Sequence, residues 1–402
     1  MNILMVSPVH PDTPHISAVR AWQFAKGLAA LGHKVVFMTA PLRDQASTWH
    51  GALTTHNWQQ PYIVEACDNG QTDISLPAPL RKLRTGLRLI VDGGARGGWV
   101  RAVVIAAQSN SSAFHPDVVW CTFGALEAAF AAKRIANKLA CPWVLDIKDN
   151  WELFVPHGLR RLMVWRTSGW AMVTTNADFT KQKAMQWQHT SGKIIYSGVD
   201  DAFFQYQGTA TKAQFELTIT LVGSLYSNEY LTVLMMGIDK WAHSLSENQR
   251  GQLVIRYLGG DIRLFNDAAK QCIPNLHVEA LGYVSTSDMA RYCSQSLLNM
   301  YVRHAGTFHH KLLELLACAR PIVVYPAETQ ESRQLTEDAG GELIEASTAD
   351  AIAVQIARVQ NEVVDLSSSA RSQHPQKHYT WANQSQLLEQ VLLETVNTKQ
   401  AI

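Results

Sequence analysis

The chain has 402 residues, a length that suits about two domains. Hydrophobic residues make up 47% of it and charged residues 17%, which excludes an intrinsically disordered chain and indicates large buried cores. The formal net charge is +1, so no overall field attracts nucleic acid, and any basic binding surface must be local.

The chain begins with the pattern of a parallel α/β sheet. A buried strand at 3–7 is followed by a loop rich in proline and histidine at 8–15, a helix at 17–31 and a strand at 34–40. The first turn lacks GxGxxG, so a standard dinucleotide site is not expected there. Ligands of such sheets bind beyond the carboxyl ends of the strands, which makes the loop at 8–17 a candidate wall of a site, with an ordinary surface loop as the alternative.

Two stretches combine basic and apolar residues. The first, at 80–108, is almost free of acids and is divided by glycines into two short segments; the second, at 158–170, has the same chemistry. Such a pattern suits a surface that lies on anionic lipid, and a pair of solvated helices packed by their apolar sides is the alternative. The predicted membrane-docking residues are Arg81, Lys82, Arg84 and Arg88 in the first stretch and Arg160 and Arg161 in the second.

A strand at 115–123, an alanine-rich helix at 125–139 and a further buried strand lead to a polar loop. Lys148 and Asp149 follow the end of that strand, where enzymes built on parallel sheets place their working residues. Asp146 and Asp149 are three residues apart and could be a metal pair, but neither a histidine nor a third carboxylate with ligand spacing accompanies them. We therefore expect no metal site.

A polar, nonperiodic segment at 205–216 suits an interdomain linker. A second alternation of strands and helices follows it. Gly223 and Gly259 lie at the ends of two of its strands, where glycine lets the backbone approach a ligand, although either could simply form a tight turn. The predicted strands are 217–226, 253–261, 276–284, 297–306 and 342–347, the last followed by a helix at 349–363.

The stretch 306–325 combines a loop, a helix and a buried strand. Gly306 and Thr307 supply a flexible entry and a cap, and an Arg-Pro pair stops the helix. Lys311 and Glu314 share one side of the helix near its N-terminus, where backbone N–H groups suit phosphate and a carboxylate accepts ribose hydroxyls. This arrangement predicts a nucleotide site, and an amphipathic helix with a solvated lysine and glutamate is the alternative.

Ordered motifs along nearly the whole chain resemble glycosyltransferase family 4, the retaining enzymes of the GT-B fold. The N-terminal half carries HPDVVW, PWVLDIKDNW and KIIYSGVDDAFF, and the C-terminal half carries ITLVGSLY, KLLELLACARPIVVY and TWANQ. Each motif alone is weakly specific, whereas their order and spacing together are fairly specific. The sequence looks closest to the glycosyltransferases of surface-polysaccharide pathways.

The resemblance implies an α/β fold of the GT-B type, with two doubly wound Rossmann-like domains facing across a cleft. Residues 1–203 would form the N-terminal acceptor domain, and residues 204–377 would form the C-terminal nucleotide-sugar donor domain. A C-terminal helix at 378–397 would cross back and pack on the N-terminal domain.

The resemblance also implies where the donor binds. Glu314 matches the second carboxylate of the family's E-x7-E motif, which holds the donor ribose, whereas the first carboxylate is replaced by Gly306. The family's glycine loop carries an arginine where Ser224 stands, so other cations, Arg303 and Lys311 among them, are expected near the diphosphate. The predicted donor-binding residues are Gly223, Ser224, Gly259, Arg303, Gly306, Thr307, Phe308, His309, Lys311, Leu312 and Glu314, with Arg263 as a further candidate cation.

The acceptor is expected against the N-terminal domain, and the residues predicted on this side are His10, His15 and Ser17. Lys148 and Asp149 stand where the family has a His-Asp pair, and Asp149 is the first choice of general base, with a purely structural role as the alternative. Transfer would retain the anomeric configuration and need no obligatory cofactor or metal. The donor substrate would be a UDP-, GDP- or dTDP-sugar, and the acceptor a glycan or a lipid-linked glycan.

Three functions remain open from the sequence. The first is a glycosyltransferase of cell-surface polysaccharide synthesis, peripheral on the inner face of the cell membrane. The second is a nucleotide-sugar epimerase of the same shape, which should need more carboxylates and histidines in its site. The third is a catalytically silent relative that serves as a binding or scaffold subunit, a reading favoured by the glycine at 306.

Cysteine usage and hydropathy bear on the compartment. The six cysteines form no CxxC pair and are typical of small buried hydrophobes in a reducing compartment. No apolar run approaches the ~18 residues needed to span a bilayer. These features predict a cytoplasmic protein. The net charge of +1 predicts no nucleic acid as a partner, and the sequence gives no indication of the oligomeric state.

Overall fold

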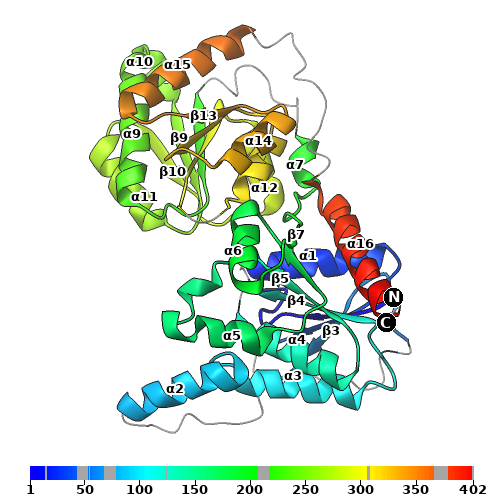
Figure 1. Cartoon of the computed structure of the whole chain (residues 1–402). Helices are drawn as coiled ribbons and strands as arrows, with labels where there is room; N and C mark the ends of the chain where they lie inside the picture. The colour runs from blue at the N-terminus through cyan, green and yellow to red at the C-terminus, as the bar shows by residue number, and fades with distance from the viewer. Residues whose placement is uncertain are drawn as a thin grey trace. The chain divides into compact units, whose positions relative to one another are not determined.

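The computed structural model describes residues 1–13, 16–42, 53, 55–67, 78–123, 125–206, 217–305, 308–365 and 379–400 (Figure 1). The chain forms two compact units, one of Met1–Gly198 with Trp381–Ile402 and the other of Val199–Thr380. Each unit has its own parallel sheet with helices packed against it, which confirms the predicted pair of Rossmann-like folds. The units divide at Gly198 and Trp381, whereas the sequence suggested boundaries at 203/204 and 377/378.

The N-terminal unit is built on seven parallel strands in the order β3-β2-β1-β4-β5-β6-β7. The order reverses beside β1, and in sheets of this kind ligands bind where the order reverses. The edge strand β3 was not predicted from the sequence. The strands are β1 (Asn2–Val6), β2 (Lys34–Thr39), β3 (Tyr62–Glu65), β4 (Val118–Phe123), β5 (Trp143–Ile147), β6 (Met172–Thr175) and β7 (Lys193–Ile194). The helices are α1 (Ile16–Ala30), α2 (Ala78–Asp92), α3 (Gly97–Ser109), α4 (Leu126–Lys138), α5 (Arg160–Thr167), α6 (Asp178–Gln188) and α16 (Trp381–Gln400), with short 3₁₀ turns at Trp151–Leu153 and His157–Leu159.

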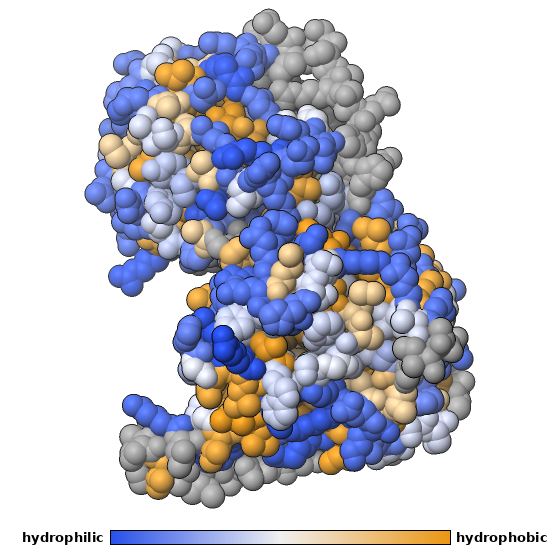
Figure 2. Space-filling model, in the orientation of Figure 1, coloured by the Kyte–Doolittle hydropathy of each residue, from blue (hydrophilic) through white to orange (hydrophobic). Residues whose placement is uncertain are grey.

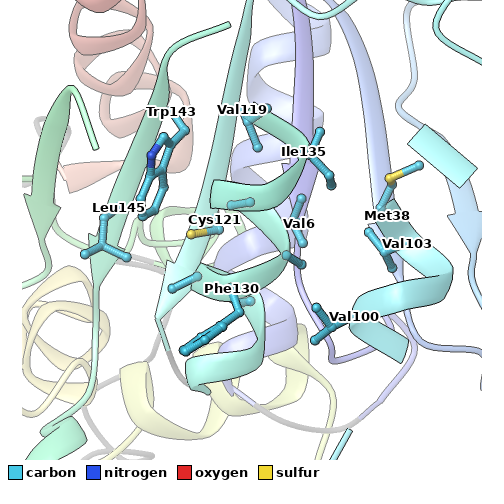
Figure 3. Close-up of a cluster of buried hydrophobic side chains, with 14 of the residues drawn as sticks. Val6, Met38, Val100, Val103, Val119, Cys121, Phe130, Ile135, Trp143 and Leu145 are labelled. Atoms are coloured by element: carbon cyan, nitrogen blue, oxygen red, sulfur yellow. The ribbon is translucent and has the colours of Figure 1, made fainter. Parts of the chain in front are cut away.

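Both faces of this sheet are buried, and alternate residues of a strand serve opposite cores. In β1, Ile3 and Met5 join the core formed with α1 and α16, whereas Leu4 and Val6 join the core formed with α3 and α4. Figure 3 shows the second core, in which Phe130 of α4 lies near strand residues of the sheet. A strand buried on both faces is continuously apolar, which is why these strands could be recognised from the sequence.

The C-terminal helix α16 returns to the N-terminal unit, as predicted. Its residues Leu388 and Leu392 are buried in the core with Phe24 of α1. The ring of Trp381 meets that of Phe24 edge to face, with centroids 5.4 Å apart. Gly27 of α1 lets the two helices approach closely, because a Cβ at this position would overlap Ser385 of α16.

The C-terminal unit has six parallel strands in the order β10-β9-β8-β11-β12-β13, which reverses beside β8 as the first sheet does beside β1. The strands are β8 (Thr218–Val222), β9 (Val254–Leu258), β10 (His277–Ala280), β11 (Leu298–Val302), β12 (Ile322–Tyr325) and β13 (Leu343–Glu345). The helices are α7 (Ala202–Gln205), α9 (Asn228–His243), α10 (Glu247–Gln252), α11 (Ile262–Cys272), α12 (Thr286–Ser294), α13 (Lys311–Ala317), α14 (Gln330–Asp338) and α15 (Ala349–Asp365).

The core of this unit positions the carboxyl ends of its strands. Trp241 of α9, Tyr257 of β9 and Phe265 of α11 are almost fully buried in one apolar cluster. The helix predicted within 306–325 is α13, and the chain after it takes a left-handed conformation at Ala319, with φ of 54°. This turn delivers the chain into β12.

Candidate functional site

One tyrosine hydroxyl ties together the loops that follow β8 and β9. Tyr257 Oη donates to Gly223 O at 2.8 Å and accepts from Asp261 N at 3.0 Å. Asp261 Oδ2 in turn accepts from Leu225 N at 2.8 Å. Gly259 packs so closely that a Cβ there would overlap both Tyr257 Oη and Gly223 O. The loop after β8, which contains Gly223, and the loop after β9, which contains Gly259, are therefore held together at the carboxyl edge of the sheet. We call this pair of loops the rim.

Lys311 lies against this rim. Gly223 has a φ of +84°, a conformation that glycine adopts without strain, and a Cβ placed on it would lie 3.6 Å from Lys311 Cγ. Leu312 and Leu313 follow Lys311 in α13 and are buried, so they hold the helix on the core. The fold thus brings the lysine of α13 to the glycine loop after β8.

Glu314 lies one turn along α13 and stays ionised. Its Oε2 lies 2.6 Å from Lys311 Nζ, and its Oε1 lies 3.3 Å from His310 Nε2. Burial alone would raise its pKa, but the Lys311 ammonium and the contact with His310 outweigh burial and lower the pKa to about 2. The Glu314 side chain is 13% exposed, so it is not fully closed off from solvent.

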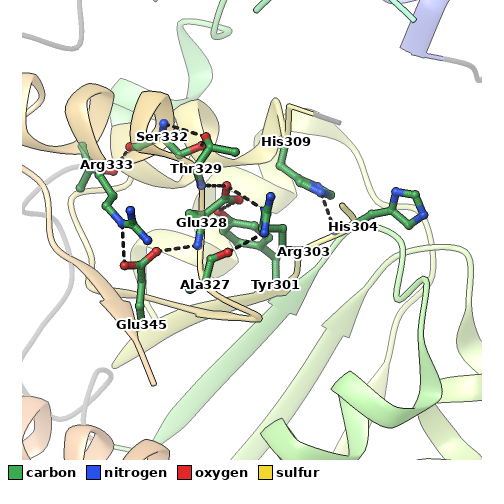
Figure 4. Close-up of polar contacts among 11 residues, drawn as sticks. Tyr301, Arg303, His304, His309, Ala327, Glu328, Thr329, Ser332, Arg333 and Glu345 are labelled. Carbon is green, nitrogen blue, oxygen red and sulfur yellow. Dashed lines mark hydrogen bonds and ion pairs between the residues drawn. The ribbon is translucent and has the colours of Figure 1, made fainter. Parts of the chain in front are cut away.

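Arg303 follows β11, and its guanidinium is bonded to residues of the C-terminal unit (Figure 4). Its Nη1 donates to Ala327 O at 2.7 Å, and its Nε lies 3.4 Å from Glu328 Oε2. Glu328 is buried and also accepts from Tyr301 Oη at 2.7 Å. Burial and the Glu328 charge raise the pKa of Tyr301 well above its usual value, so the phenol stays a donor. Arg303 therefore neutralises a buried carboxylate, a partner that the sequence did not reveal.

His309 is buried and held in one neutral tautomer. Its Nε2 accepts from His304 N at 2.8 Å, so Nδ1 carries the proton. Burial lowers the pKa of His309 against the opposing effect of the Glu328 charge. Phe308, its neighbour in the chain, is half-buried. These contacts favour a structural role for His309 at the start of α13.

For the remaining predicted donor residues that it describes, the structure gives no hydrogen bond or ion pair with Lys311 or Glu314. Ser224 is exposed on the loop after β8. Arg263 of α11 is 97% exposed, with its Nε 3.8 Å from Asp267 Oδ2. Gly306 and Thr307 lie outside the described residues, so their predicted roles stay predictions.

Two exposed tyrosines at this edge were not singled out from the sequence. Tyr283, which follows β10, is 84% exposed, and its Oη lies 2.8 Å from the position that a Cβ of Gly260 would take. Tyr226, which follows β8, is 54% exposed, and its ring centroid lies 5.0 Å from that of His304. Such rings can stack on a nucleotide base. The sequence placed Tyr283 inside the predicted strand 276–284, whereas β10 ends at Ala280, so the tyrosine lies in the loop after the strand.

In the N-terminal unit, Lys148 and Ser17 come together. Lys148 Nζ donates to Ser17 Oγ at 2.9 Å, and both side chains are buried. Burial lowers the pKa of Lys148 to about 8, although the neighbouring Asp149 opposes the shift. Asp149 itself is half-buried. A lysine with this pKa is mostly protonated at neutral pH and loses its proton only slightly above it.

Asp146 belongs to the core and not to a metal pair. Arg20, which is fully buried, donates to its two carboxylate oxygens at 2.8 and 3.0 Å, and Thr174 Oγ1 donates to it at 2.8 Å. This bidentate pair joins α1 to β5. Over the part of the chain that the structure describes, no three His, Cys, Asp or Glu side chains are grouped so that they could hold a metal ion.

Of the two histidines predicted on the acceptor side, the structure describes His10, which, unlike Ser17, makes no hydrogen bond with Lys148. His10 Nε2 lies 3.0 Å from Glu65 Oε1 at the end of β3, and His10 Nδ1 accepts from Asp12 N at 3.1 Å. His10 is therefore bonded to its own sheet edge. His15 lies outside the described residues.

Helix α2 carries part of the predicted membrane-docking surface. Lys82 is exposed on it, and Arg84 and Arg88 are half-buried, while the side chain of Arg81 is not among those described. Apolar side chains are exposed on the same helix: Leu80 by 49%, Leu87 by 53% and Val91 by 48%.

Helix α5 and the turn before it carry the rest. Arg161 is exposed, whereas Arg160 Nη2 donates to Glu152 O at 2.8 Å. Leu153 is 76% exposed and Trp165 66% exposed. Among the described helices, none is long and apolar enough to cross a membrane.

Comparison with known proteins confirms the predicted fold, and part of the chain matches a family of glycosyl transferases. Residues 216–362 match the family described as glycosyl transferases group 1. The sequence matches no curated protein.

The structure resembles sucrose-phosphate synthase from Thermosynechococcus elongatus at 13% identity and a TM-score of 0.68, covering 98% of this chain and 99% of that one. It resembles HepE from Anabaena in complex with UDP-glucose at 14% identity and a TM-score of 0.60, covering 100% and 99%. It also resembles a putative UDP-N-acetylglucosamine 2-epimerase from Listeria monocytogenes at 11% identity and a TM-score of 0.55, covering 96% and 94%.

Proposed function

We propose that this chain, whose residues 216–362 match the group 1 glycosyl transferases, transfers a sugar from a nucleotide-sugar donor to a glycan or lipid-linked acceptor. The observation that carries the proposal is the place of α13: Lys311 lies against Gly223 of the loop after β8, and the ionised Glu314 lies one turn further on. A cation and a carboxylate at the carboxyl edge of a parallel sheet suit a diphosphate and a ribose.

Within this proposal, Glu314 accepts hydrogen bonds from the ribose hydroxyls, and Lys311 faces the diphosphate. Departure of the nucleoside diphosphate leaves negative charge on its oxygens, and a fixed ammonium stabilises that charge in the transition state. The glycine loop after β8 admits the phosphates, because neither Gly223 nor Gly259 has a side chain in the way. Tyr283 or Tyr226 would stack on the base. The donor is a UDP-, GDP- or dTDP-sugar, with no obligatory cofactor.

The acceptor residues of this proposal lie in the N-terminal unit. Asp149 is the candidate base for the acceptor hydroxyl, and Lys148 with Ser17 positions the hydroxyl through their hydrogen bond. Because Lys148 has a pKa of about 8, its ammonium is available near neutral pH to stabilise the Asp149 carboxylate. We propose retention of anomeric configuration and a reaction without an obligatory metal.

The experiment measures donor turnover across a panel of nucleotide sugars, each with and without a lipid-linked glycan acceptor. Release of nucleoside diphosphate that rises with acceptor is the expected result. Two alternatives give other outcomes. An epimerase, which the resemblance to the Listeria protein favours, would convert donor to its epimer without acceptor and release no nucleotide. A silent scaffold, which Gly306 favours, would bind a nucleotide without turning any donor over. A protein that neither binds nor turns over any donor would rule out the enzyme.

We further propose that the N-terminal unit docks on the anionic inner face of the cell membrane, in the pathway of a surface polysaccharide. Exposed Leu87 and Val91 and the basic residues of α2 offer the required mixture of apolar and positive groups. A lipid-linked acceptor would then reach an enzyme already held at its membrane.

A further inference from the structure

A pocket of about 310 Å³ opens between α4 and α5 in the N-terminal unit, and none of the predicted donor, acceptor or catalytic residues lines it. Three cationic side chains line it, those of Lys133, Arg134 and Arg166, and no carboxylate does. Asn137 and Trp165 also line the pocket. A cavity of this size accommodates a small ligand and not a folded partner.

One of the three cations is already neutralised. Arg134 Nη1 donates to Asp92 Oδ1 at 2.8 Å, and Arg134 Nη2 donates to Val91 O at 2.7 Å. Asp92 also pairs with Arg101, at 3.1 Å, so its charge is shared between two arginines. The Asp92 carboxylate is therefore committed outside the pocket.

The other two cations have no acidic partner among the described residues. Lys133 Nζ donates to Arg166 O at 2.9 Å, a neutral acceptor. The Arg166 guanidinium lies 5.5 Å from the centroid of the Phe130 ring, and its buried Nε meets no hydrogen-bond partner among the described residues. Burial lowers the pKa of Lys133, and the nearby Arg166 charge lowers it further, so the two cations repel each other. A bound anion would remove that repulsion.

We propose that this pocket binds a phosphate-bearing group between Lys133 and Arg166. The Arg166 guanidinium, whose Nη2 also donates to the neutral Val91 O at 3.4 Å, offers its remaining N–H donors to phosphate oxygens, and the Lys133 ammonium adds a second charge. Asn137 contributes a neutral amide donor at the edge of the pocket. The site lies in the N-terminal unit and is independent of the donor site proposed above.

Two sources can supply the phosphate: a free diphosphate or the headgroup of an anionic lipid. Trp165 lines the pocket and is 66% exposed, and Figure 2 shows hydrophobic side chains gathered near α5 and the adjoining end of α2. An exposed tryptophan beside a phosphate pocket suits the boundary between lipid headgroups and acyl chains. The test below separates the two sources.

The first arm uses inorganic pyrophosphate in isothermal titration calorimetry, with UDP in excess to occupy the donor site. Arg166→Gln removes the guanidinium. Asn137→Asp places a carboxylate at the edge of the pocket, and because Asn137 is exposed, we expect this variant to fold as the wild type does. Lys138→Gln is the matched control, since Lys138 is exposed on the same helix and outside the pocket. We expect both pocket variants to bind about tenfold or more weakly than the wild type and the control to bind equally.

The second arm measures sedimentation with vesicles of phosphatidylcholine alone and with an equimolar mixture of phosphatidylcholine and phosphatidylglycerol. A several-fold loss in the mixed vesicles, shown by Arg166→Gln and Asn137→Asp but not by Lys138→Gln, assigns the pocket to a lipid headgroup. A loss confined to pyrophosphate assigns it to a soluble diphosphate. The proposal fails if the wild type binds neither probe, or if the two pocket variants match Lys138→Gln in both arms.

Discussion

At the scale of single residues, Glu314 is the sharpest test of the donor site. We expect Glu314→Gln to weaken UDP binding by about tenfold to a hundredfold, because a hydrogen bond to a charged group contributes about 1.5–3 kcal/mol. Calorimetric titration with UDP measures the change. Glu279→Gln is a suitable control, since Glu279 of β10 pairs with Arg256 of β9 and does not belong to α13. Equal affinity in wild type and Glu314→Gln would show that the ribose is bound elsewhere.

Lys148 predicts a dependence of stability on pH. Its pKa in the folded protein is about 8, below the ordinary value of 10.5, so between these values the unfolded chain holds a proton that the folded chain has lost. The free energy of unfolding should therefore rise with pH across this window, and the cost of burying the charge is fully present below pH 8. Urea unfolding of wild type and Lys148→Met between pH 7 and 10.5 tests this. The difference in stability between them should change in favour of the wild type as pH rises; a constant difference would contradict the lowered pKa.

Single residues were predictable only where local sequence determines their surroundings. Lys311 and Glu314 are three apart on one helix, and their ion pair follows from helical geometry. Glu328 is different, because its partners Tyr301 and Arg303 lie at the end of β11, and only the fold brings them to the loop after β12. The same holds for Lys148 and Ser17, which are 131 residues apart in the chain.

At the scale of elements, the packing of α16 on α1 depends on Gly27. A Cβ at Gly27 would lie 2.5 Å from Ser385 Cβ and overlap its hydroxyl, so Gly27→Ala should push the helices apart and cost about 1–3 kcal/mol of stability. Denaturant unfolding measures this loss. Ser385→Gly clears the space, and the double variant should recover most of it. If the double variant is as unstable as Gly27→Ala alone, the close approach of these helices is not the cause.

The amphipathic helix α2 yields a prediction about membranes. Arg84→Glu reverses one charge beside the exposed apolar residues of α2 and should weaken binding to phosphatidylglycerol vesicles by about fivefold or more, because each basic residue near an anionic surface contributes about 1 kcal/mol. Lys270→Glu, exposed on α11 of the other unit, carries the same charge change as a control. Co-sedimentation at low and physiological salt measures both. Loss of binding in the control as well would point to net charge and not to α2.

Most elements were predictable, because strands buried on both faces and helices of regular apolar spacing leave clear patterns. One exception is β3, whose four residues include exposed Ile63 and half-buried Tyr62. An edge strand of this length has neither a continuous apolar run nor a full alternation, so only its pairing with β2 identifies it. The division of the basic stretch into α2 and α3 was predictable, since the glycines between them interrupt both helices.

At the scale of the whole molecule, two units with separate cores should respond separately. In differential scanning calorimetry, UDP should raise the transition of the Val199–Thr380 unit, since a ligand stabilises the part that binds it. Gly27→Ala should lower the transition of the other unit only. One transition that shifts with both changes would show that the units unfold as a single cooperative body.

The contacts of the Tyr257 hydroxyl predict which residues should change together among related sequences. It bonds to Gly223 and to Asp261, and Gly259 packs against it, so residues on two strands share one small space. A larger residue at 259 would displace both the tyrosine and the loop after β8. Substitution at any of these positions therefore changes what is tolerated at the others. Among relatives, tyrosine at 257 with glycine at 223 and 259 should be inherited or lost as a set, which a comparison of related sequences can check.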